Sequence, residues 1–129
     1  MKSFDVSFTP ADFAVLKNRN LEDTLCVVFD VFRATSSMVT ALANGAEMIM
    51  PVAEIADALA LKQKTPGIFS VLLAGERHGV RIRAAVAGGT DFDLGNSPRE
   101  FTKEKVRGKT IVMTTTNGTR ALRACAQAR

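Results

Sequence analysis

The sequence contains no tryptophan and no tyrosine, and only one histidine and two cysteines among its 129 residues. A protein that binds single-stranded nucleic acid stacks bases on aromatic side chains set among basic ones, and this chain offers no such platform. A zinc site needs several Cys or His ligands at close spacing, so His78 alone does not indicate one. We expect Cys26 and Cys125 to be small apolar side chains and not a disulfide.

Long apolar runs are also missing. No stretch approaches the roughly 18 residues that a transmembrane helix needs, and the first residues do not resemble a signal peptide. We therefore expect a cytoplasmic protein without a membrane partner. The length suits a single domain, residues 1–129, with a hydrophobic core of its own.

Acidic residues are scarce in the second part of the chain. Residues 1–74 carry 6 basic and 8 acidic side chains, whereas residues 75–129 carry 11 basic and 5 acidic ones. Such a bias suits an anionic ligand. Because no aromatic residues accompany the arginines, the composition favours a small anion, and we expect no nucleic-acid partner.

Strand patterns and helix patterns alternate along the chain, which predicts an α/β fold. Strands are expected at residues 3–8, 26–29, 46–52, 68–74 and 109–113, and helices at residues 10–17, 36–42, 54–64, 97–105 and 120–129. The helix at 97–105 is predicted from a capping box that begins at Ser97. A break is expected at residues 65–67, and a long, partly mobile loop at residues 79–96.

Residues 26–37 combine a strand, an acid, a base and a helix start. The apolar run at 26–29 predicts a strand buried on both faces, and Asp30 and Arg33 follow at its carboxyl end. In open α/β sheets this edge, near the helix N-termini, is where ligands bind. Asp30 suits a cation and Arg33 an anion, although the same two residues also fit a surface salt bridge worth about 1 kcal/mol or less.

A second polar cluster follows the last expected strand. Residues 114–120 contain four threonines, an asparagine and a glycine, and place Arg120 in the first turn of a helix. A helix needs one cap, so the repeated hydroxyls indicate an anion-binding loop, while strand-forming threonines with a cap are the structural alternative. Asp30 and Glu76 at two strand ends, with Asp93 as a third candidate, are the hard oxygen ligands that magnesium takes beside water and phosphate. These residues favour metal-assisted phosphate chemistry.

Three other patterns do not predict a site. Residues 108–110 precede a strand and lack the earlier glycine of a phosphate-binding P-loop. Asp91 and Asp93 are not preceded by an apolar strand, which leaves an aspartyl-phosphate phosphatase as a minor alternative. Cys26 lies within an apolar run and not in a loop of backbone amides, so it does not fit a thiol-phosphatase nucleophile.

Four blocks, taken together and in this order, resemble the 2-phosphosulfolactate phosphatase family, the ComB-like proteins of coenzyme M biosynthesis. The blocks are residues 30–36, 75–77, 92–98 and 114–122, and residues 5–8 also fit. The resemblance implies a three-layer α/β/α fold with a mostly parallel central sheet. It also implies a magnesium-dependent phosphatase that hydrolyses 2-phosphosulfolactate, or a similar small phosphate ester, to 3-sulfolactate and phosphate.

Carried onto the matching positions, the resemblance implies Mg²⁺ ligands at Asp30 and Glu76. A larger set of polar residues would surround the phosphate and the sulfonate: Arg33, Asn96, Ser97, Thr115, Thr116, Asn117 and Arg120. We expect Asp30, Arg33, Asp93 and Arg120 to carry the catalysis, with Asp93 orienting the nucleophile.

Members of the family are longer than this chain, so the resemblance covers their N-terminal part, and we expect a domain truncated at its C-terminus. A non-catalytic anion-binding module, or an inactive fragment of such an enzyme, is therefore the alternative function. A sheet edge left open by truncation would pair with a second chain, so we also expect a homo-oligomer.

Overall fold

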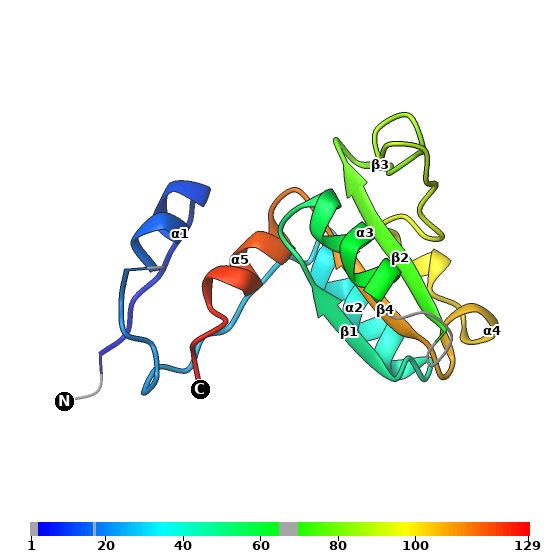
Figure 1. Ribbon diagram of the computed structural model, residues 1–129. Coiled ribbons are helices and arrows are strands. Elements are labelled where there is room, and N and C mark those ends of the chain that lie inside the picture. The colour runs from blue at the N-terminus through cyan, green and yellow to red at the C-terminus, as the bar shows by residue number, and fades with distance from the viewer. Residues whose placement is uncertain (1–2, 17, 65–69) are drawn as a thin grey trace.

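The computed structural model describes residues 3–16, 18–64 and 70–129, and Figure 1 shows their helices and strands. Three predicted features lie partly or wholly outside the described residues. They are the end of the helix expected at 10–17, the break expected at 65–67, and the first two residues of the strand expected at 68–74.

Three parallel strands form the centre of the sheet. They are β1 (Met48–Pro51), β4 (Thr110–Thr114) and β2 (Val71–Arg77), and β4 lies between the other two. A short strand, β3 (Val80–Arg81), pairs antiparallel with β2 and gives the order β1-β4-β2-β3. The prediction of an α/β fold with a mostly parallel sheet is confirmed.

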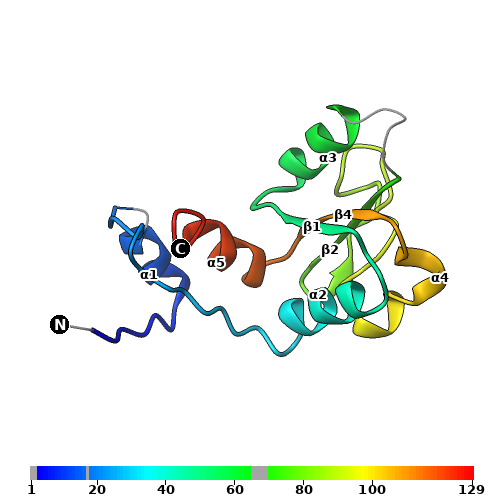
Figure 2. The same ribbon diagram turned by 90° about the horizontal axis from the view of Figure 1, so that it is seen from below.

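The described residues also form five α-helices. Their bounds are α1 (Pro10–Leu16), α2 (Ala34–Ala43), α3 (Ile55–Lys64), α4 (Lys103–Val106) and α5 (Gly118–Ala124), with one 3₁₀ turn, η1 (Pro98–Glu100). Figures 1 and 2 show α1 and α5 together at one side of the sheet. At the start of α1, the carboxylate of Asp12 accepts hydrogen bonds from the N–H groups of Phe8 and Thr9, as an acid in a first helical turn should.

The core lies on both faces of the sheet, because side chains alternate along each strand. On β4, Ile111 and Met113 belong to the cluster that contains α2, whereas Val112 belongs to the cluster that contains α3. Helix α2 buries Ala34, Met38 and Ala41 at helical spacing, and it ends where Gly45 adopts a positive φ of 89°. Helices therefore cover both faces, while the three-layer arrangement of the family fold stays a prediction.

The strands expected at residues 3–8 and 26–29 do not form, which corrects the prediction of a strand buried on both faces. Both segments are extended, and Phe29 is 84% exposed. The apolar pattern of a strand becomes a strand only beside a neighbour that supplies hydrogen bonds and a buried face. Residues 26–29 lie along α5 instead: just before them, the carbonyl of Thr24 accepts a hydrogen bond of 2.9 Å from the N–H of Arg129.

The helix expected at residues 97–105 is also different. It splits into η1 and α4, and Ser97 makes no capping hydrogen bond with its side chain. Glu100 does not reach back to Ser97, because its carboxylate accepts a hydrogen bond of 2.9 Å from the N–H of Gly95. Phe101, which is fully buried, has a non-helical backbone between the two short helices.

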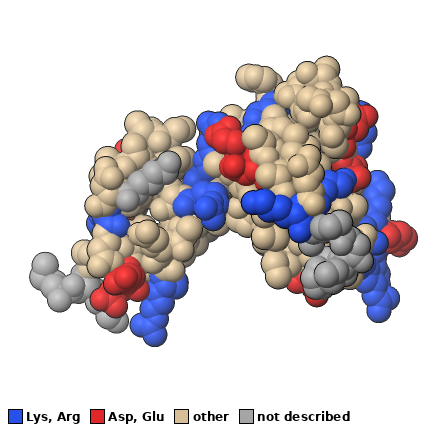
Figure 3. Space-filling model, in the orientation of Figure 1, with Lys and Arg blue, Asp and Glu red and all other residues tan. Residues whose placement is uncertain are grey.

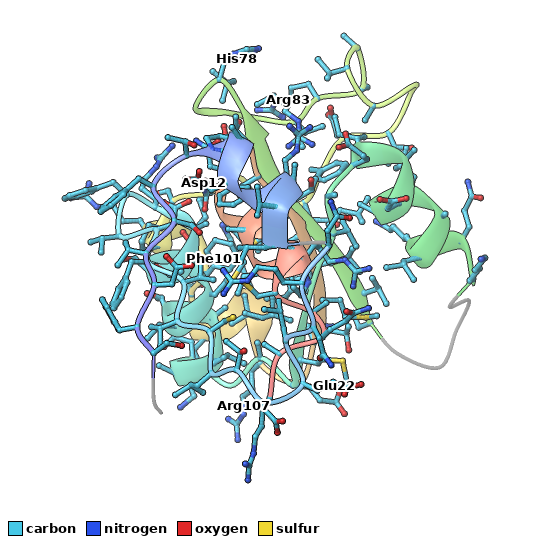
Figure 4. The ribbon with its side chains drawn as sticks, turned by 90° about the vertical axis from the view of Figure 1, so that its left-hand side faces the viewer. Asp12, Glu22, His78, Arg83, Phe101 and Arg107 are labelled. Carbon is cyan, nitrogen blue, oxygen red and sulfur yellow. The ribbon has the colours of Figure 1, made fainter. Side chains whose placement is uncertain are left out.

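Two further segments differ in extent. The loop expected at residues 79–96 contains β3, and its apolar side chains Ile82 and Phe92 are buried in the core. The last helix begins at Gly118 and ends at Ala124, five residues before the expected end. Figure 4 shows Phe101 near the centre of the molecule, with His78 and Arg107 at opposite ends.

Candidate functional site

The carboxyl ends of β2 and β4 meet at one edge of the sheet, as expected for adjacent parallel strands. They lie so close at Gly75 that a Cβ atom there would come within 2.1 Å of the carbonyl oxygen of Thr114. Only glycine permits this approach. The residues that follow Gly75 and Thr114 are therefore brought together by the backbone itself.

Glu76 is the most enclosed charged group at this edge, with 7% of its surface exposed. One carboxylate oxygen accepts a hydrogen bond of 2.7 Å from the N–H of Thr116, and the other accepts one of 2.8 Å from the N–H of Gly79. Burial would raise the pKa of Glu76, but these backbone hydrogen bonds outweigh it and hold the pKa below its usual value. Glu76 thus stays ionised and ties the loop after β4 to the turn after β2.

Arg33 reaches the same turn from a distant part of the sequence. Its guanidinium donates a hydrogen bond of 3.2 Å to the carbonyl of Gly79, whose N–H is bound to Glu76. One arginine and one buried carboxylate therefore bind the two backbone polar groups of a single residue, Gly79.

Asp30 lies against the start of α5. A Cβ atom on Gly118 would be 2.5 Å from a carboxylate oxygen of Asp30 and 2.6 Å from the Cβ of Ala34, so glycine allows this contact. No described residue donates a hydrogen bond to the carboxylate of Asp30. Asp30 and Glu76 consequently both contact residues 116–118, and their role as joint metal ligands stays a prediction.

The threonines of this loop divide into two kinds. Thr115 and Thr119 are buried and cap each other: each N–H donates to the hydroxyl of the other residue, at 2.8 and 3.1 Å. Thr116 and Asn117 are exposed, although the N–H of Thr116 is already bound to Glu76. The side chains of Thr116 and Asn117 are therefore accessible to a ligand, whereas the hydroxyl of Thr115 is hydrogen-bonded within the loop.

Two arginines stand beside the loop. Arg120 makes an ion pair of 3.0 Å with Glu54, in which both side chains are about half exposed. Arg77, which sequence reasoning assigned no role, donates to the hydroxyl of Thr114 and to the carbonyl of Glu76, at 3.0 and 2.7 Å. Burial, and next the positive charge of Arg120, lower the pKa of Arg77. Its place directly after Glu76 at a strand end was the signal that could have identified it.

Asn96 and Ser97 follow a segment that runs beside β2. A parallel bridge joins Leu94 to Ala74, which carries the chain toward the same edge of the sheet. Asn96 is buried, and its side-chain oxygen has no hydrogen-bond partner among the parts of the chain that the structure describes. Ser97 is half-buried at the start of η1.

Asp93 is not brought to Glu76. Its carboxylate accepts a hydrogen bond of 2.8 Å from the N–H of Leu73, in the middle of β2, and one of 3.3 Å from Lys62 of α3. The carboxylate of Asp93 therefore takes the hydrogen bond that a neighbouring strand would otherwise accept from Leu73, and it also forms an ion pair with Lys62 of α3. Through these contacts, Asp93 connects β2 to α3.

A magnesium site is compatible with two carboxylates. Residues 3–16, 18–64 and 70–129 contain no cluster of three or more His, Cys, Asp or Glu residues that could hold a metal. Mg²⁺ usually keeps several waters and takes one or two carboxylates together with substrate phosphate. Asp30 and Glu76, which both contact residues 116–118, would suit that limited demand.

The two cysteines are neighbours, which the sequence did not predict. Both are free and half-buried. Burial, with a hydrogen bond to Cys26, raises the pKa of the Cys125 thiol to about 11, so this thiol stays protonated.

One surface hollow lies elsewhere, between β1, α3 and Arg123 of α5. It contains neither carboxylate of the candidate site. The converging hydrogen bonds at Glu76 mark the candidate site. No helix among the described residues is long and apolar enough to cross a membrane.

Comparisons with known proteins agree with the resemblance seen in the sequence. The sequence model of the 2-phosphosulpholactate phosphatase family matches residues 12–129. Curated relatives bear the name "Probable 2-phosphosulfolactate phosphatase". One from Caldicellulosiruptor saccharolyticus is 50% identical over 83% of this chain and 41% of its own length. Another from Carboxydothermus hydrogenoformans is 45% identical over 97% of this chain and 45% of its own length. The chain thus spans less than half the length of these relatives.

Proposed function

This chain belongs to the 2-phosphosulfolactate phosphatase family, and on that premise we propose that it provides the phosphate-binding part of a phosphoric monoester hydrolase. The proposed reaction converts 2-phosphosulfolactate, or a similar small phosphate ester, to 3-sulfolactate and inorganic phosphate. One observation carries the proposal: carboxylates from two distant blocks, Asp30 and Glu76, contact the same loop of residues 116–118.

Asp30 and Glu76 would hold Mg²⁺ in this proposal. Each oxygen of Glu76 accepts one backbone hydrogen bond, which leaves further acceptor capacity on both oxygens. The bound ion would supply positive charge to the phosphoryl oxygens.

The arginines would hold the anionic groups of the substrate. Arg33 is anchored to the carbonyl of Gly79 through one nitrogen, and its remaining N–H groups are available for phosphate oxygens. Arg120 would exchange its exposed ion pair with Glu54 for the sulfonate. Further substrate contacts are proposed for the exposed side chains of Thr116 and Asn117, and for Asn96 with Ser97.

Hydrolysis itself requires little covalent chemistry from the protein. Water attacks phosphorus, the bond between phosphorus and the ester oxygen breaks, and the ester oxygen leaves as a hydroxyl with a proton from solvent. Catalysis then comes from positioning and from positive charge around the phosphoryl group. Asp93 receives no step in this scheme, because Lys62 and the backbone of Leu73 occupy its carboxylate.

The test is the release of inorganic phosphate from 2-phosphosulfolactate, with Mg²⁺ and with excess chelator. We expect release that depends on Mg²⁺ and falls by at least about a hundredfold in Asp30→Asn, the scale seen when an electrostatic group of an active site is removed. Asp23→Asn is the matched control, because Asp23 is an exposed acid near the same segment. Turnover that persists in the chelator, or in Asp30→Asn, would overturn the proposal.

A non-catalytic anion-binding module is the second candidate. It is favoured by the internal hydrogen bonds of Thr115 and Thr116. Calorimetric binding of sulfolactate without any phosphate release from 2-phosphosulfolactate would select it.

A further inference from the structure

Two free thiols meet near the candidate site, and no step of the proposed hydrolysis uses them. Cys26 and Cys125 are both free and half-buried, and a hydrogen bond joins their side chains. One comes from the extended segment before α2 and the other from the end of α5. Because the two residues are far apart in the sequence, the fold alone brings their sulfur atoms together.

Contacts on either side of the pair hold the two segments in register. The carbonyl of Thr24 accepts a hydrogen bond of 2.9 Å from the N–H of Arg129, and the carboxylate of Asp30 lies against Gly118 at the start of α5. The extended segment therefore runs antiparallel to α5, with the two cysteines between these contacts. Figures 1 and 2 show the chain between α1 and α2 passing along α5.

The backbone around Cys26 is weakly anchored. Within the described parts of the chain, no group accepts a hydrogen bond from the N–H groups of residues 25–29. The segment is fixed again at Asp30, whose N–H donates to the hydroxyl of Thr35 at 3.1 Å and whose carbonyl accepts from the N–H of Thr35 at 3.0 Å. Residues 25–29 can therefore shift relative to α5 without breaking a backbone hydrogen bond from these N–H groups.

The same two segments connect one lobe of the molecule to the rest. Helices α1 and α5 lie together beside the sheet, and Figure 3 shows the lobe that they form projecting from the body that contains the sheet. The chain leaves this lobe through residues 25–31, which lead to α2, and returns to it through α5, which follows β4. A bond between Cys26 and Cys125 would join both connections.

The contact between the two thiols points to a site of reversible oxidation. We propose that hydrogen peroxide converts Cys26 and Cys125 to a disulfide, and that a thiol reductant restores them. The new bond would fix the segment that carries Asp30 against α5. The inference rests on the contacts of the two cysteines, and it does not require phosphatase activity.

The reaction begins at Cys26. Burial, and next the hydrogen bond to Cys26, raise the pKa of the Cys125 thiol to about 11, and a protonated thiol is a poor nucleophile. The thiolate of Cys26 attacks one peroxide oxygen, the O–O bond breaks, and hydroxide leaves, which gives a sulfenic acid. The sulfur of Cys125 then displaces the sulfenic hydroxyl group, which leaves as water with the thiol proton of Cys125. In total, two thiols and one peroxide become one disulfide and two waters.

The experiment treats the reduced 129-residue chain with a small excess of hydrogen peroxide and follows its intact mass and its peptide map. We expect the loss of two hydrogen atoms, a link between the peptides of Cys26 and Cys125 within one chain, and full reversal by dithiothreitol. A link between two copies of the chain would overturn the proposal. So would oxygen added to either thiol without a link, or no reaction under conditions that oxidise free cysteine.

Two matched variants separate the roles of the two thiols. In Cys125→Ser the oxidation should stop at the sulfenic acid of Cys26, which dimedone traps as a stable adduct. In Cys26→Ser the remaining thiol is protonated, so we expect at least about tenfold less adduct. The unchanged protein should give little adduct, because its sulfenic acid is consumed by the second thiol. Equal labelling of the two variants would contradict the assignment of Cys26 as the thiol that reacts first.

Thermal unfolding tests whether the disulfide fits the fold. The bond closes a loop of about 100 residues and so restricts the unfolded chain, and we expect oxidation to raise the melting temperature by at least about 6 °C. Circular dichroism with and without dithiothreitol measures the shift, and Cys26→Ser, which cannot form the bond, should show none. A disulfide that forms but leaves the melting temperature unchanged or lowers it would mean that the two segments must move to be joined, and would overturn the inference.

Discussion

Glu76 and Asp30, the two carboxylates of the candidate site, lie in regions that differ in secondary structure and in burial. Glu76 ends a strand in the sheet, is buried and accepts two backbone hydrogen bonds. Asp30 lies on an extended segment outside the sheet, between exposed apolar side chains. One half of the site is therefore positioned by the packed sheet, whereas the other half lies on a segment whose outer face is exposed.

The largest expected effect is in the sheet. Gly75→Ala should destabilise the chain by about 3 kcal/mol or more, because its Cβ would press on the backbone of Thr114. Urea unfolding followed by circular dichroism measures this. Gly88→Ala is the control, since Gly88 also has a positive φ but open space around it, and should cost about 1 kcal/mol. A free energy for Gly75→Ala equal to that of Gly88→Ala would contradict the close approach.

Glu76→Gln tests the anchor of the sheet half. The loss of the charged acceptor for the N–H groups of Thr116 and Gly79 should cost about 1.5–3 kcal/mol. The same urea titration applies, with Glu47→Gln as an exposed control that should stay within about 0.5 kcal/mol of the unchanged protein. If both variants unfold like the unchanged protein, Glu76 does not hold the loop.

The pH dependence of stability should follow from the lowered pKa of Glu76. Because the folded-state pKa is below the unfolded value, ionised Glu76 stabilises the fold above about pH 4.5, and this contribution is lost as the pH falls through the folded pKa. Thermal unfolding of the unchanged protein and of Glu76→Gln between pH 7 and pH 3 measures it. The difference between their melting temperatures should shrink toward acid pH; a constant difference would argue against the lowered pKa.

Arg120→Ala should have a small effect on stability. Its ion pair with Glu54 is half exposed, and such pairs contribute about 1 kcal/mol or less. A double-mutant cycle with Glu54→Ala, measured by urea unfolding at low and high salt, gives the coupling. A coupling of several kcal/mol would mean that Arg120 is committed to the fold and is not available for an anion.

The smallest effect is expected on the extended segment of the isolated chain. Val27→Asp should change the free energy of unfolding by no more than about 0.5 kcal/mol, because the side chain is already exposed. Thermal unfolding of the 129-residue chain measures this. A loss comparable to that of Glu76→Gln would show that the side chain of Val27 is buried in the folded chain.

The sheet could be predicted from the sequence because its signals are local. The apolar runs of β1, β2 and β4 end at recognisable breaks, and their parallel arrangement follows from the helices between them. The same reasoning located Glu76 and residues 114–120 directly after two of these strands, and the two segments are in contact in the structure.

The remaining features depend on partners that are distant in sequence. Residues 26–29 have the composition of a strand, but a strand also requires a neighbour, and composition does not say whether one is present. The pairing of Thr115 with Thr119, and of Asp93 with Lys62, is likewise decided by packing. The capping box predicted at Ser97 does not form, because the carboxylate of Glu100 accepts a hydrogen bond from the N–H of Gly95 instead.

The central claim is that Asp30 and Glu76 act on one ligand at residues 116–118. The most direct measurement is the broadening of backbone amide signals by added Mn²⁺, used as a paramagnetic substitute for Mg²⁺. We predict that the amides of residues 30, 76 and 116–118 broaden together, and that Asp30→Asn removes the broadening at all of them. Broadening at Glu76 that persists in Asp30→Asn, or that is centred elsewhere in the chain, would contradict the account.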